Sequence, residues 1–175
     1  MKNLMCIAAV VVFFIQTAFL PASHCRVILP TDVNFIVETC RKTPNPTVCL
    51  SSLKSDPRSA HSDIYGLAVI MIDVVKAKST ATQSKIKEVL KQHRGDKSLK
   101  DCAYSYRAVV EDDIPVAYEA IKLSRSMFAL ESMNDVVIEA NSCTRAVSYF
   151  PHLPHLNKVV ADVASVAAAI IDAFP

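Results

Sequence analysis

Apolar side chains recur every three or four residues through most of the chain, which is the spacing of one face of an α-helix. The clearest example is segment 63–93, where Asp63 suits the position that caps a helix N-terminus. Its apolar face consists of Ile64, Leu67, Met71, Val74, Ala81 and Val89, and its polar face of Lys76, Lys78, Lys85 and Lys87. Gly95 follows the last turn and suits a left-handed helix stop. We therefore expect one long amphipathic helix over 63–93.

The same pattern predicts three further long helices. The second starts at Ser98 and contains Pro115, whose ring should kink the helix because it removes a backbone donor and crowds the preceding turn. The third spans about 129–148, and the fourth spans 157–174 after a proline-containing connection. Four long helices with short links are typical of an up-down-up-down four-helix bundle, so we expect an all-α bundle over residues 63–174.

Two short helices are predicted before the bundle. One runs from Asp32 to about Cys40 and the other covers 47–54, with a proline-rich turn between them. Cys40 and Cys49 bracket this turn, so a disulfide between them would tie together a helical hairpin, residues 32–55. Closing a loop of roughly ten residues is worth about 2.5–3 kcal/mol in the chain-entropy description.

A second pair of cysteines agrees with antiparallel helices. Cys102 lies near the start of the second long helix, and Cys143 lies near the end of the third. Antiparallel neighbours bring these two ends together, and a disulfide there would stabilise the fold by about 4 kcal/mol. Disulfides persist in oxidising surroundings, so the two pairs indicate export from the cell.

The first 25 residues have the order of a signal peptide. Lys2 supplies a positive charge, segment 4–20 is almost wholly apolar, and small residues follow. The apolar run is short for a membrane span, although a retained anchor stays open as an alternative. We expect cleavage between positions 22 and 25, and a cut after Cys25 would leave four cysteines and no unpaired thiol. The mature chain, 26–175, then suits a single domain outside the membrane.

Composition excludes several classes of function. Without Lys2 the mature chain has 18 basic and 17 acidic residues, a net charge of +1. No basic stripe with interleaved aromatic side chains is evident, so a nucleic acid is not an expected partner. Only two glycines occur, which disfavours hairpin-rich β folds and the glycine loops that cradle phosphates.

The chain shows no constellation of reactive side chains. His152 and His155 straddle Pro154 and lack the spacing of a helical zinc motif, and the acidic run Glu111–Asp113 would point in different directions on a helix. Neither a G-x-S-x-G elbow nor a C-x-x-C pair occurs. We therefore expect no catalytic residue, no metal and no cofactor, and a rigid surface that recognises another molecule.

Three methionines leave one alternative open. Met71, Met127 and Met133 could line a cavity for a lipid or hormone, although apolar stripes at this spacing usually pack a bundle core. The corresponding function would be a secreted helical protein that binds a small ligand, or an allergen-like or storage protein.

Several runs of the sequence resemble the plant invertase and pectin methylesterase inhibitor family. They are Phe35–Pro44, Cys49–Leu53, Ser55–Ser59, Gly66–Asp73 with Lys76–Lys78, Leu99–Tyr106 and the segment from Leu156 onward. The likeness covers essentially the whole mature chain and includes the register of the four cysteines. The runs at 55–59 and 67–78 are similar to the invertase-inhibitor branch in particular.

The resemblance implies a four-helix bundle with an N-terminal hairpin and the disulfides Cys40–Cys49 and Cys102–Cys143. It implies an enzyme inhibitor rather than an enzyme, and a monomer that forms a non-covalent one-to-one complex. The implied target is a secreted acid invertase, in the cell wall (apoplast) or the vacuole. Pectin methylesterase is the alternative target for the same fold.

The resemblance also indicates which residues would contact the target. In invertase-directed relatives a Pro-Lys-Phe run between helices two and three enters the substrate cleft. The matching positions here are Ser126, Met127 and Phe128, of which only Phe128 fits. A glycosidase cleft carries paired carboxylates, so we expect Arg125 to supply the missing positive charge and all four residues to contact the enzyme. In the alternative interpretation they form an ordinary interhelical link and the chain inhibits poorly.

Overall fold

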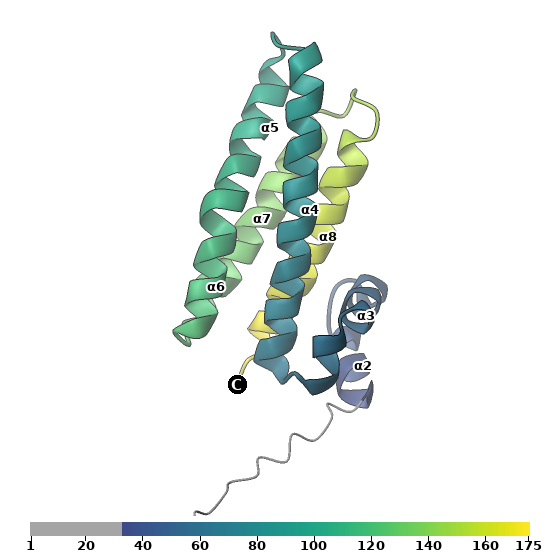
Figure 1. The fold of residues 1–175 in the computed structure, drawn as a ribbon, viewed down its shortest axis with the longest axis vertical. Coiled ribbons are helices and arrows are strands. Elements are labelled where there is room, and N and C mark those ends of the chain that lie inside the picture. The colour runs from purple at the N-terminus through teal and green to yellow at the C-terminus, as the bar shows by residue number, and fades with distance from the viewer. Residues whose placement is uncertain (1–32) are drawn as a thin grey trace, which may run out of the picture.

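The long amphipathic segments form an antiparallel bundle of four rods (Figure 1). In chain order the rods are α4 (Ile64–Gln92), α5 (Lys97–Ala108) continued by α6 (Ile114–Lys122), α7 (Ser126–Ala146) and α8 (Leu153–Asp172). The computed structural model describes residues 33–175, so the expected signal peptide, residues 1–25, lies outside the described residues. The predicted all-α, up-down-up-down bundle is confirmed.

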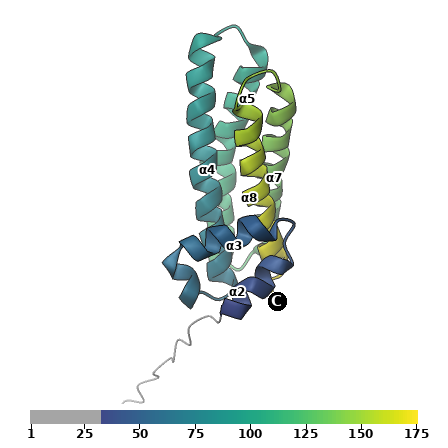
Figure 2. The same ribbon diagram turned by 90° about the vertical axis from the view of Figure 1, so that its right-hand side faces the viewer.

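The predicted hairpin is present beside the end of the bundle that holds the C-terminus (Figures 1 and 2). It consists of α2 (Val33–Arg41) and α3 (Pro46–Ser55), joined by a disulfide between Cys40 and Cys49, whose side chains are fully buried. A 3-10 helix (Pro57–His61), which the sequence pattern did not predict, connects the hairpin to α4.

The second disulfide joins α5 to α7. Cys102 and Cys143 are buried, with Cα atoms 5.4 Å apart, as the antiparallel arrangement predicted. The three methionines differ in burial: Met71 and Met133 are fully buried in the core, whereas Met127 is exposed. The three methionines therefore do not line one shared cavity.

The cap predicted at the start of α4 is confirmed, and the stop predicted at its end is wrong. Asp63 Oδ1 accepts a hydrogen bond from the Gly66 N–H at 2.9 Å. Gly95 is not left-handed, since neither described glycine has a positive φ. Asp96 makes the turn instead: its N–H donates to the carbonyl oxygen of His93 at 2.9 Å, and its carboxylate caps α5.

A wider helical turn interrupts the second rod directly before α6, the helix that contains Pro115. Residues Val109–Asp113 form a π-helical turn directly before α6, and the proline follows in the first turn of α6. Because proline lacks an N–H and its ring crowds the preceding turn, the regular pattern of hydrogen bonds cannot continue unchanged here. The irregularity predicted at Pro115 therefore takes the form of a change of helix type.

Helix α7 begins at Ser126 and not near residue 129, so residues 126–128 do not form the expected link. The chain turns in a Schellman motif: Arg125 N–H donates to the Ala120 oxygen at 2.8 Å, and Ser124 N–H donates to the Ile121 oxygen at 3.1 Å. Ser124 adopts the left-handed conformation at φ 54°. Glycine usually occupies this position, and its absence explains why the sequence pattern missed the tight stop.

Helix α8 begins at Leu153, four residues earlier than expected. His152 precedes it at φ 71°, and Pro154 lies in the first turn, where its missing N–H has no intrahelical partner to lose. By length and composition α8 could cross a membrane, but 56% of the relevant window is buried inside the bundle. Its apolar character is that of a core helix packed between α4 and α7.

The early start of α8 places Asn157 inside the core. Its Oδ1 accepts a hydrogen bond from the Tyr106 hydroxyl at 2.9 Å, and both side chains are fully buried. Gln83 Nε2 donates to the carbonyl oxygen of Tyr106 at 3.2 Å. Burial raises the pKa of the Tyr106 phenol, so it stays a hydrogen-bond donor. These bonds link α4, α5 and α8 and favour one register of the three helices.

Candidate functional site

The four residues expected to contact a target lie where α6 turns into α7. Arg125 directly precedes α7, and Ser126, Met127 and Phe128 form its first turn. Met127 is 64% exposed and Phe128 is 56% exposed, whereas the next residue, Ala129, is fully buried. The first turn of α7 therefore exposes two large apolar side chains to solvent, directly before the buried Ala129.

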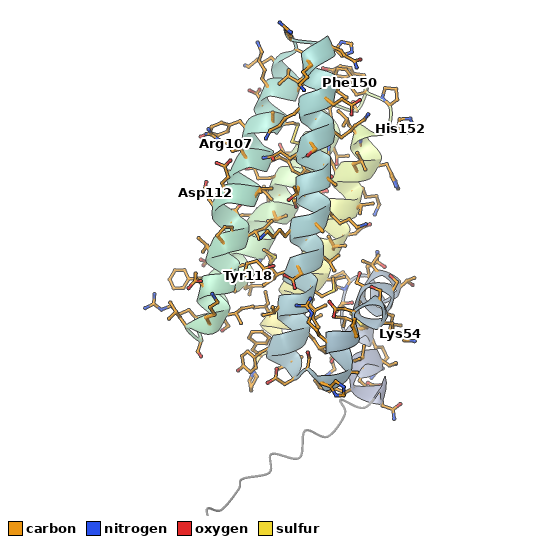
Figure 3. All side chains as sticks on the ribbon, viewed as in Figure 1. Lys54, Arg107, Asp112, Tyr118, Phe150 and His152 are labelled. Atoms are coloured by element: carbon orange, nitrogen blue, oxygen red, sulfur yellow. A yellow bond between two sulfur atoms is a disulfide. The ribbon has the colours of Figure 1, made fainter. Side chains whose placement is uncertain are left out.

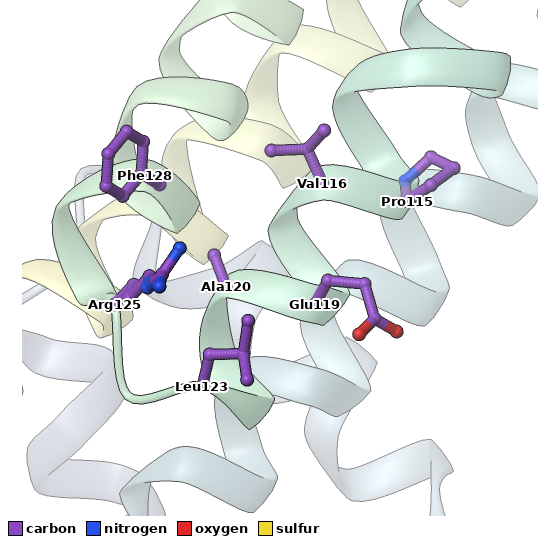
Figure 4. Close-up of a pocket in the computed structure, with 7 residues that line it drawn as sticks. All are labelled: Pro115, Val116, Glu119, Ala120, Leu123, Arg125 and Phe128. Atoms are coloured by element: carbon purple, nitrogen blue, oxygen red, sulfur yellow. The ribbon is translucent and has the colours of Figure 1, made fainter.

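A groove adjoins this turn and extends the apolar surface onto α6. It has a volume of about 320 Å³ and is lined by Pro115, Val116, Glu119, Ala120, Leu123, Arg125 and Phe128. Figure 4 shows Phe128 and Arg125 on one side of the groove and the side chains of α6 on the other. Val116 and Leu123 are 48% and 59% exposed. Contiguous exposed apolar surface of this kind marks interaction sites on soluble proteins.

Sequence reasoning missed the α6 half of this surface. The helical spacing of apolar residues does not distinguish Leu123 or Val116 from the buried positions of α6. Apolar spacing could not reveal their exposure, because only the packing of α6 on its neighbours decides which apolar positions stay uncovered. We name the exposed apolar set Val116, Leu123, Met127 and Phe128 the α6–α7 patch.

Arg125 gives the rim of the groove an uncompensated positive charge. The nearby carboxylate of Glu119 is already paired with Lys122 Nζ at 2.7 Å, and no described residue forms an ion pair with Arg125. Its guanidinium is exposed and carries donors in a planar fork that matches a carboxylate. The rim can therefore offer charge-assisted hydrogen bonds to an acidic group on a partner.

The backbone under the patch is held in one conformation. The Schellman motif ends α6, and the Phe128 N–H donates to the Arg125 oxygen at 3.1 Å. Ser132 Oγ donates in turn to the Phe128 oxygen at 2.9 Å. A surface ordered before binding loses less conformational entropy on association, which favours affinity.

A polar cluster holds the base of the hairpin against the bundle. Arg58 Nη2 donates to Asp56 Oδ2 and to Asp73 Oδ2, each at 2.6 Å, and the Tyr118 hydroxyl donates to Asp73 Oδ1. Hydrogen bonds to Asp56 and then Asp73 raise the pKa of Arg58, and burial raises the pKa of Tyr118. Tyr118, labelled in Figure 3, lies on α6 and so couples the hairpin to the helix that carries half of the patch.

Acidic side chains gather where the π-helical turn meets α7. Asp113 is partly buried there, and the pKa of its carboxyl is raised from 3.8 to about 6. Burial is the main cause, followed by the negative charges of Asp135, Asp112 and Glu139. Asp112, on the same turn, points outward from the second rod (Figure 3). Among the described residues, no group of three or more histidine, cysteine or acidic side chains could hold a metal ion.

The raised pKa of Asp113 predicts a bundle that is more stable in mild acid. Between pH 4 and 6 the folded state binds a proton that the unfolded state has released, so stability rises as pH falls through that range. Asp113→Asn removes this dependence, and the variant should be more stable than the parent at pH 7 by about 1 kcal/mol after allowance for solvent screening. The difference should vanish near pH 4.

Urea unfolding at several pH values checks this expectation. Glu131→Gln, a matched loss of one exposed negative charge on α7, should show no comparable pH dependence. A stability difference between Asp113→Asn and the parent that stays constant from pH 4 to 7 would contradict the assignment.

Comparison with known proteins identifies the architecture that carries this site. The sequence profile of the family described as plant invertase/pectin methylesterase inhibitor matches residues 34–170. The chain is 32% identical over 141 residues to the cell wall / vacuolar inhibitor of fructosidase 1 of Arabidopsis thaliana, covering 80% of this chain and 69% of that protein.

Two further relatives match over shorter segments. The pectinesterase inhibitor of Actinidia deliciosa is 39% identical over 82 residues, covering 45% of this chain and 44% of that protein. The cell wall / vacuolar inhibitor of fructosidase 2 of Arabidopsis thaliana is 40% identical over 75 residues, covering 41% and 42%.

The fold has counterparts among solved structures. A mutant form of a pectin methylesterase inhibitor from Arabidopsis superposes with a TM-score of 0.68 at 20% identity, covering 78% of this chain and 94% of that chain. Another crystal structure, of a pectin methylesterase inhibitor from Arabidopsis thaliana, gives a TM-score of 0.61, also at 20% identity, and covers 82% of this chain and 98% of that chain. The helical fold, the two disulfides and the match over residues 34–170 agree, and the chain belongs to the plant invertase/pectin methylesterase inhibitor family, whose members inhibit enzymes and are not enzymes themselves.

Proposed function

We propose that this protein inhibits a secreted acid invertase by inserting the α6–α7 patch into the mouth of the substrate cleft. The observation that carries the proposal is that two exposed apolar side chains, Met127 and Phe128, follow Arg125, which forms no ion pair with any described residue. Two of the relatives are named as inhibitors of fructosidase, and one of them matches over 80% of this chain. The inhibitor and its target would form a non-covalent one-to-one complex.

The chemistry of the target suits this surface. A glycosidase cleft carries two carboxyl groups that flank the scissile bond. Arg125 would meet this negative charge with its planar fork, while Phe128 fills space that the sugar would occupy. Because the side chains of the patch include no nucleophile, inhibition would come from occupation of the cleft and not from reaction.

The proposed location is outside the cytoplasm, in the cell wall or the vacuole. Two buried disulfides require an oxidising compartment during folding. The fructosidase-inhibitor relatives carry "cell wall / vacuolar" in their names. The signal-peptide order of residues 1–25 agrees with export.

Titration of two enzymes tests the choice of target. Purified, oxidised protein is added to acid invertase acting on sucrose and, separately, to pectin methylesterase acting on pectin. We expect stoichiometric loss of invertase activity and little effect on pectin methylesterase. Loss of pectin methylesterase activity without loss of invertase activity would make the protein a pectin methylesterase inhibitor. The 39% identity to a pectinesterase inhibitor makes this the second candidate function. Inhibition of neither enzyme would overturn the proposal.

Alanine variants test the contact site. Phe128→Ala should weaken inhibition of the target by about tenfold to hundredfold, because large side chains at the centre of an interface carry most of the binding energy. Arg125→Ala should cost about tenfold through the lost charge-assisted bonds. Inhibition constants measured with each purified variant provide the readout.

A matched pair elsewhere on the bundle provides the control. Tyr104 is 67% exposed on α5, and the Arg107 guanidinium lies 5.1 Å from the centre of its ring. Tyr104→Ala and Arg107→Ala remove an exposed aromatic ring and an exposed arginine without touching the α6–α7 patch, so inhibition should be unchanged. Equal effects of the two pairs, or no effect of Phe128→Ala and Arg125→Ala, would rule out the assigned site.

A further inference from the structure

Two segments far apart in the sequence form one surface at the bundle end opposite the hairpin. The link between α4 and α5 and the link between α7 and α8 lie side by side there (Figures 1 and 2). The Tyr149 hydroxyl donates to Asp96 Oδ2 at 2.8 Å, and the rings of His93 and Phe150 meet edge to face with centroids 5.1 Å apart. These contacts join the two links, so residues 87–100 and 145–158 act as one surface, which we name the basic end.

The basic end has a net excess of positive charge. Segments 87–100 and 145–158 together contain seven lysine or arginine residues and two acidic residues, a net charge of +5. The whole chain has a net charge of +2, which leaves −3 for all other residues. The fold therefore separates charge, with one strongly positive end on a chain that is nearly neutral overall.

The two acidic residues at this end are already engaged. Glu88 accepts from Lys85 Nζ at 3.0 Å. Asp96 accepts from the Leu99 N–H at 2.8 Å and from Tyr149, and these bonds hold the pKa of its carboxyl below the ordinary value. These two carboxylates therefore contact Lys85, the Leu99 N–H and Tyr149, and not the other cations of the basic end.

Most of the cations, in contrast, lack a partner. Lys158 pairs with Asp162 at 2.6 Å. Six others are exposed and form no ion pair with any described residue: Lys87, Lys91, Arg94, Lys97, Lys100 and Arg145. Arg94 directs its Nε to the Lys91 carbonyl oxygen at 3.4 Å, which leaves its charge unneutralised. A set of fixed, unpaired charges on a rigid bundle end attracts a polyanion.

The side chains of the basic end suit an anionic sugar polymer. Five of its seven cations are lysines, which act as separate point charges and can meet anionic groups spaced along a chain. Tyr149 is 62% exposed and offers a flat apolar ring with a polar edge, which suits the face of a sugar ring. Phe150 and His152 lie at the same end (Figure 3).

We propose that the basic end binds an anionic polysaccharide, namely a chain of uronic acid units with free carboxylates. Binding there would leave the α6–α7 patch at the other end of the bundle open to the target enzyme. The inference rests on the proposed function only for the compartment, since a cell-wall protein would meet such polymers. Its role would be to retain the inhibitor near its target.

A binding experiment with the mature, oxidised protein tests this proposal. Polygalacturonate is the probe, and binding is measured at pH 7 and low salt, where charge interactions are least screened. The triple variant Lys91→Gln, Lys97→Gln and Lys100→Gln should bind about tenfold to hundredfold more weakly, because each lysine near a dense anionic surface contributes to affinity. The control variant Lys42→Gln, Lys54→Gln and Lys78→Gln loses the same charge away from the basic end and should bind within about twofold of the parent.

Binding measurements with three other probes test which chemical class of polyanion the basic end prefers. Fully methyl-esterified polygalacturonate has no free carboxylates, so it should not bind. Double-stranded DNA and phosphatidylserine-containing vesicles should bind more weakly than polygalacturonate, and tighter binding to either would overturn the assignment to a uronate. Equal losses in the two triple variants would also overturn it, because net charge alone would then explain binding.

Inhibition assays distinguish a failure of the polymer-binding proposal from a failure of the proposed inhibitor function. Both triple variants should inhibit the target enzyme as the parent does when sucrose is the substrate and no polymer is present. Loss of polymer binding with full inhibition is the expected result for the variant at the basic end. Full inhibition by a parent protein that does not bind polygalacturonate would refute the polymer site and leave the inhibitor function standing.

Discussion

Replacing both Cys102 and Cys143 by alanine is expected to lower the free energy of unfolding by about 4 kcal/mol. The bond closes a loop with a sequence separation of 41 residues, which includes the rest of the second rod and most of α7. Without it the unfolded chain gains the conformational freedom of that loop, while the folded bundle gains little. Since small domains have total stabilities of about 5–15 kcal/mol, the variant should lose a large part of its stability. Urea unfolding followed by circular dichroism measures the change.

The other disulfide provides a matched comparison. Cys40 and Cys49 are separated by only nine residues, so their replacement by alanine should cost about 2.5–3 kcal/mol. Both double variants remove two buried sulfur atoms, and they differ mainly in loop length. A smaller loss for the Cys102 and Cys143 pair than for the hairpin pair would contradict the loop-length argument.

Asn157→Asp is expected to destabilise the protein by roughly 3–5 kcal/mol at pH 7, because it places an unpaired charge in the core. Asn157 is fully buried; its Oδ1 accepts from Tyr106, and its Nδ2 has no hydrogen-bond partner among the described residues. An aspartate would keep the bond from Tyr106 and put a second, charged carboxylate oxygen at the buried position of Nδ2.

The pH dependence of this variant has a definite sign. Burial would raise the pKa of the new carboxyl above its unfolded value, so the penalty shrinks as pH falls and the group takes up a proton. The loss at pH 5 should therefore be smaller than at pH 7. Thermal unfolding at both pH values checks this, with exposed Asn141→Asp on α7 as the control that should change stability by less than about 0.5 kcal/mol. Equal losses at the two pH values would contradict burial of a charged group.

The order and type of the helices could be predicted from the sequence because local rules decide them. The apolar spacing of segment 63–93 and the capping oxygen of Asp63 act within a few residues, so neighbouring parts of the fold were not needed to interpret them. The cysteine spacings predicted the two disulfides for a related reason, since short links leave few ways to pair antiparallel helices. The start of α7 was mispredicted because Ser124 adopts a conformation that usually requires glycine.

The candidate site could be predicted only in part. The resemblance to known inhibitors pointed to Ser126, Met127 and Phe128, but sequence alone could not place them in the first turn of a helix. The exposure of Val116 and Leu123 depends on which face of α6 its neighbours leave uncovered. That property belongs to the packing of several helices and has no local signature in the chain.

By itself the sequence determined a helical bundle braced by two disulfides, because periodicity, caps and cysteine spacing are properties of near neighbours along the chain. Only the tertiary structure decided which charges and apolar groups share a surface. It joined residues 87–100 to 145–158 in one basic end, although the chain is nearly neutral overall. It also brought Val116 and Leu123 beside Phe128. Surface neighbours of this kind are set by the antiparallel packing of helices, which places distant segments side by side at each end of the bundle.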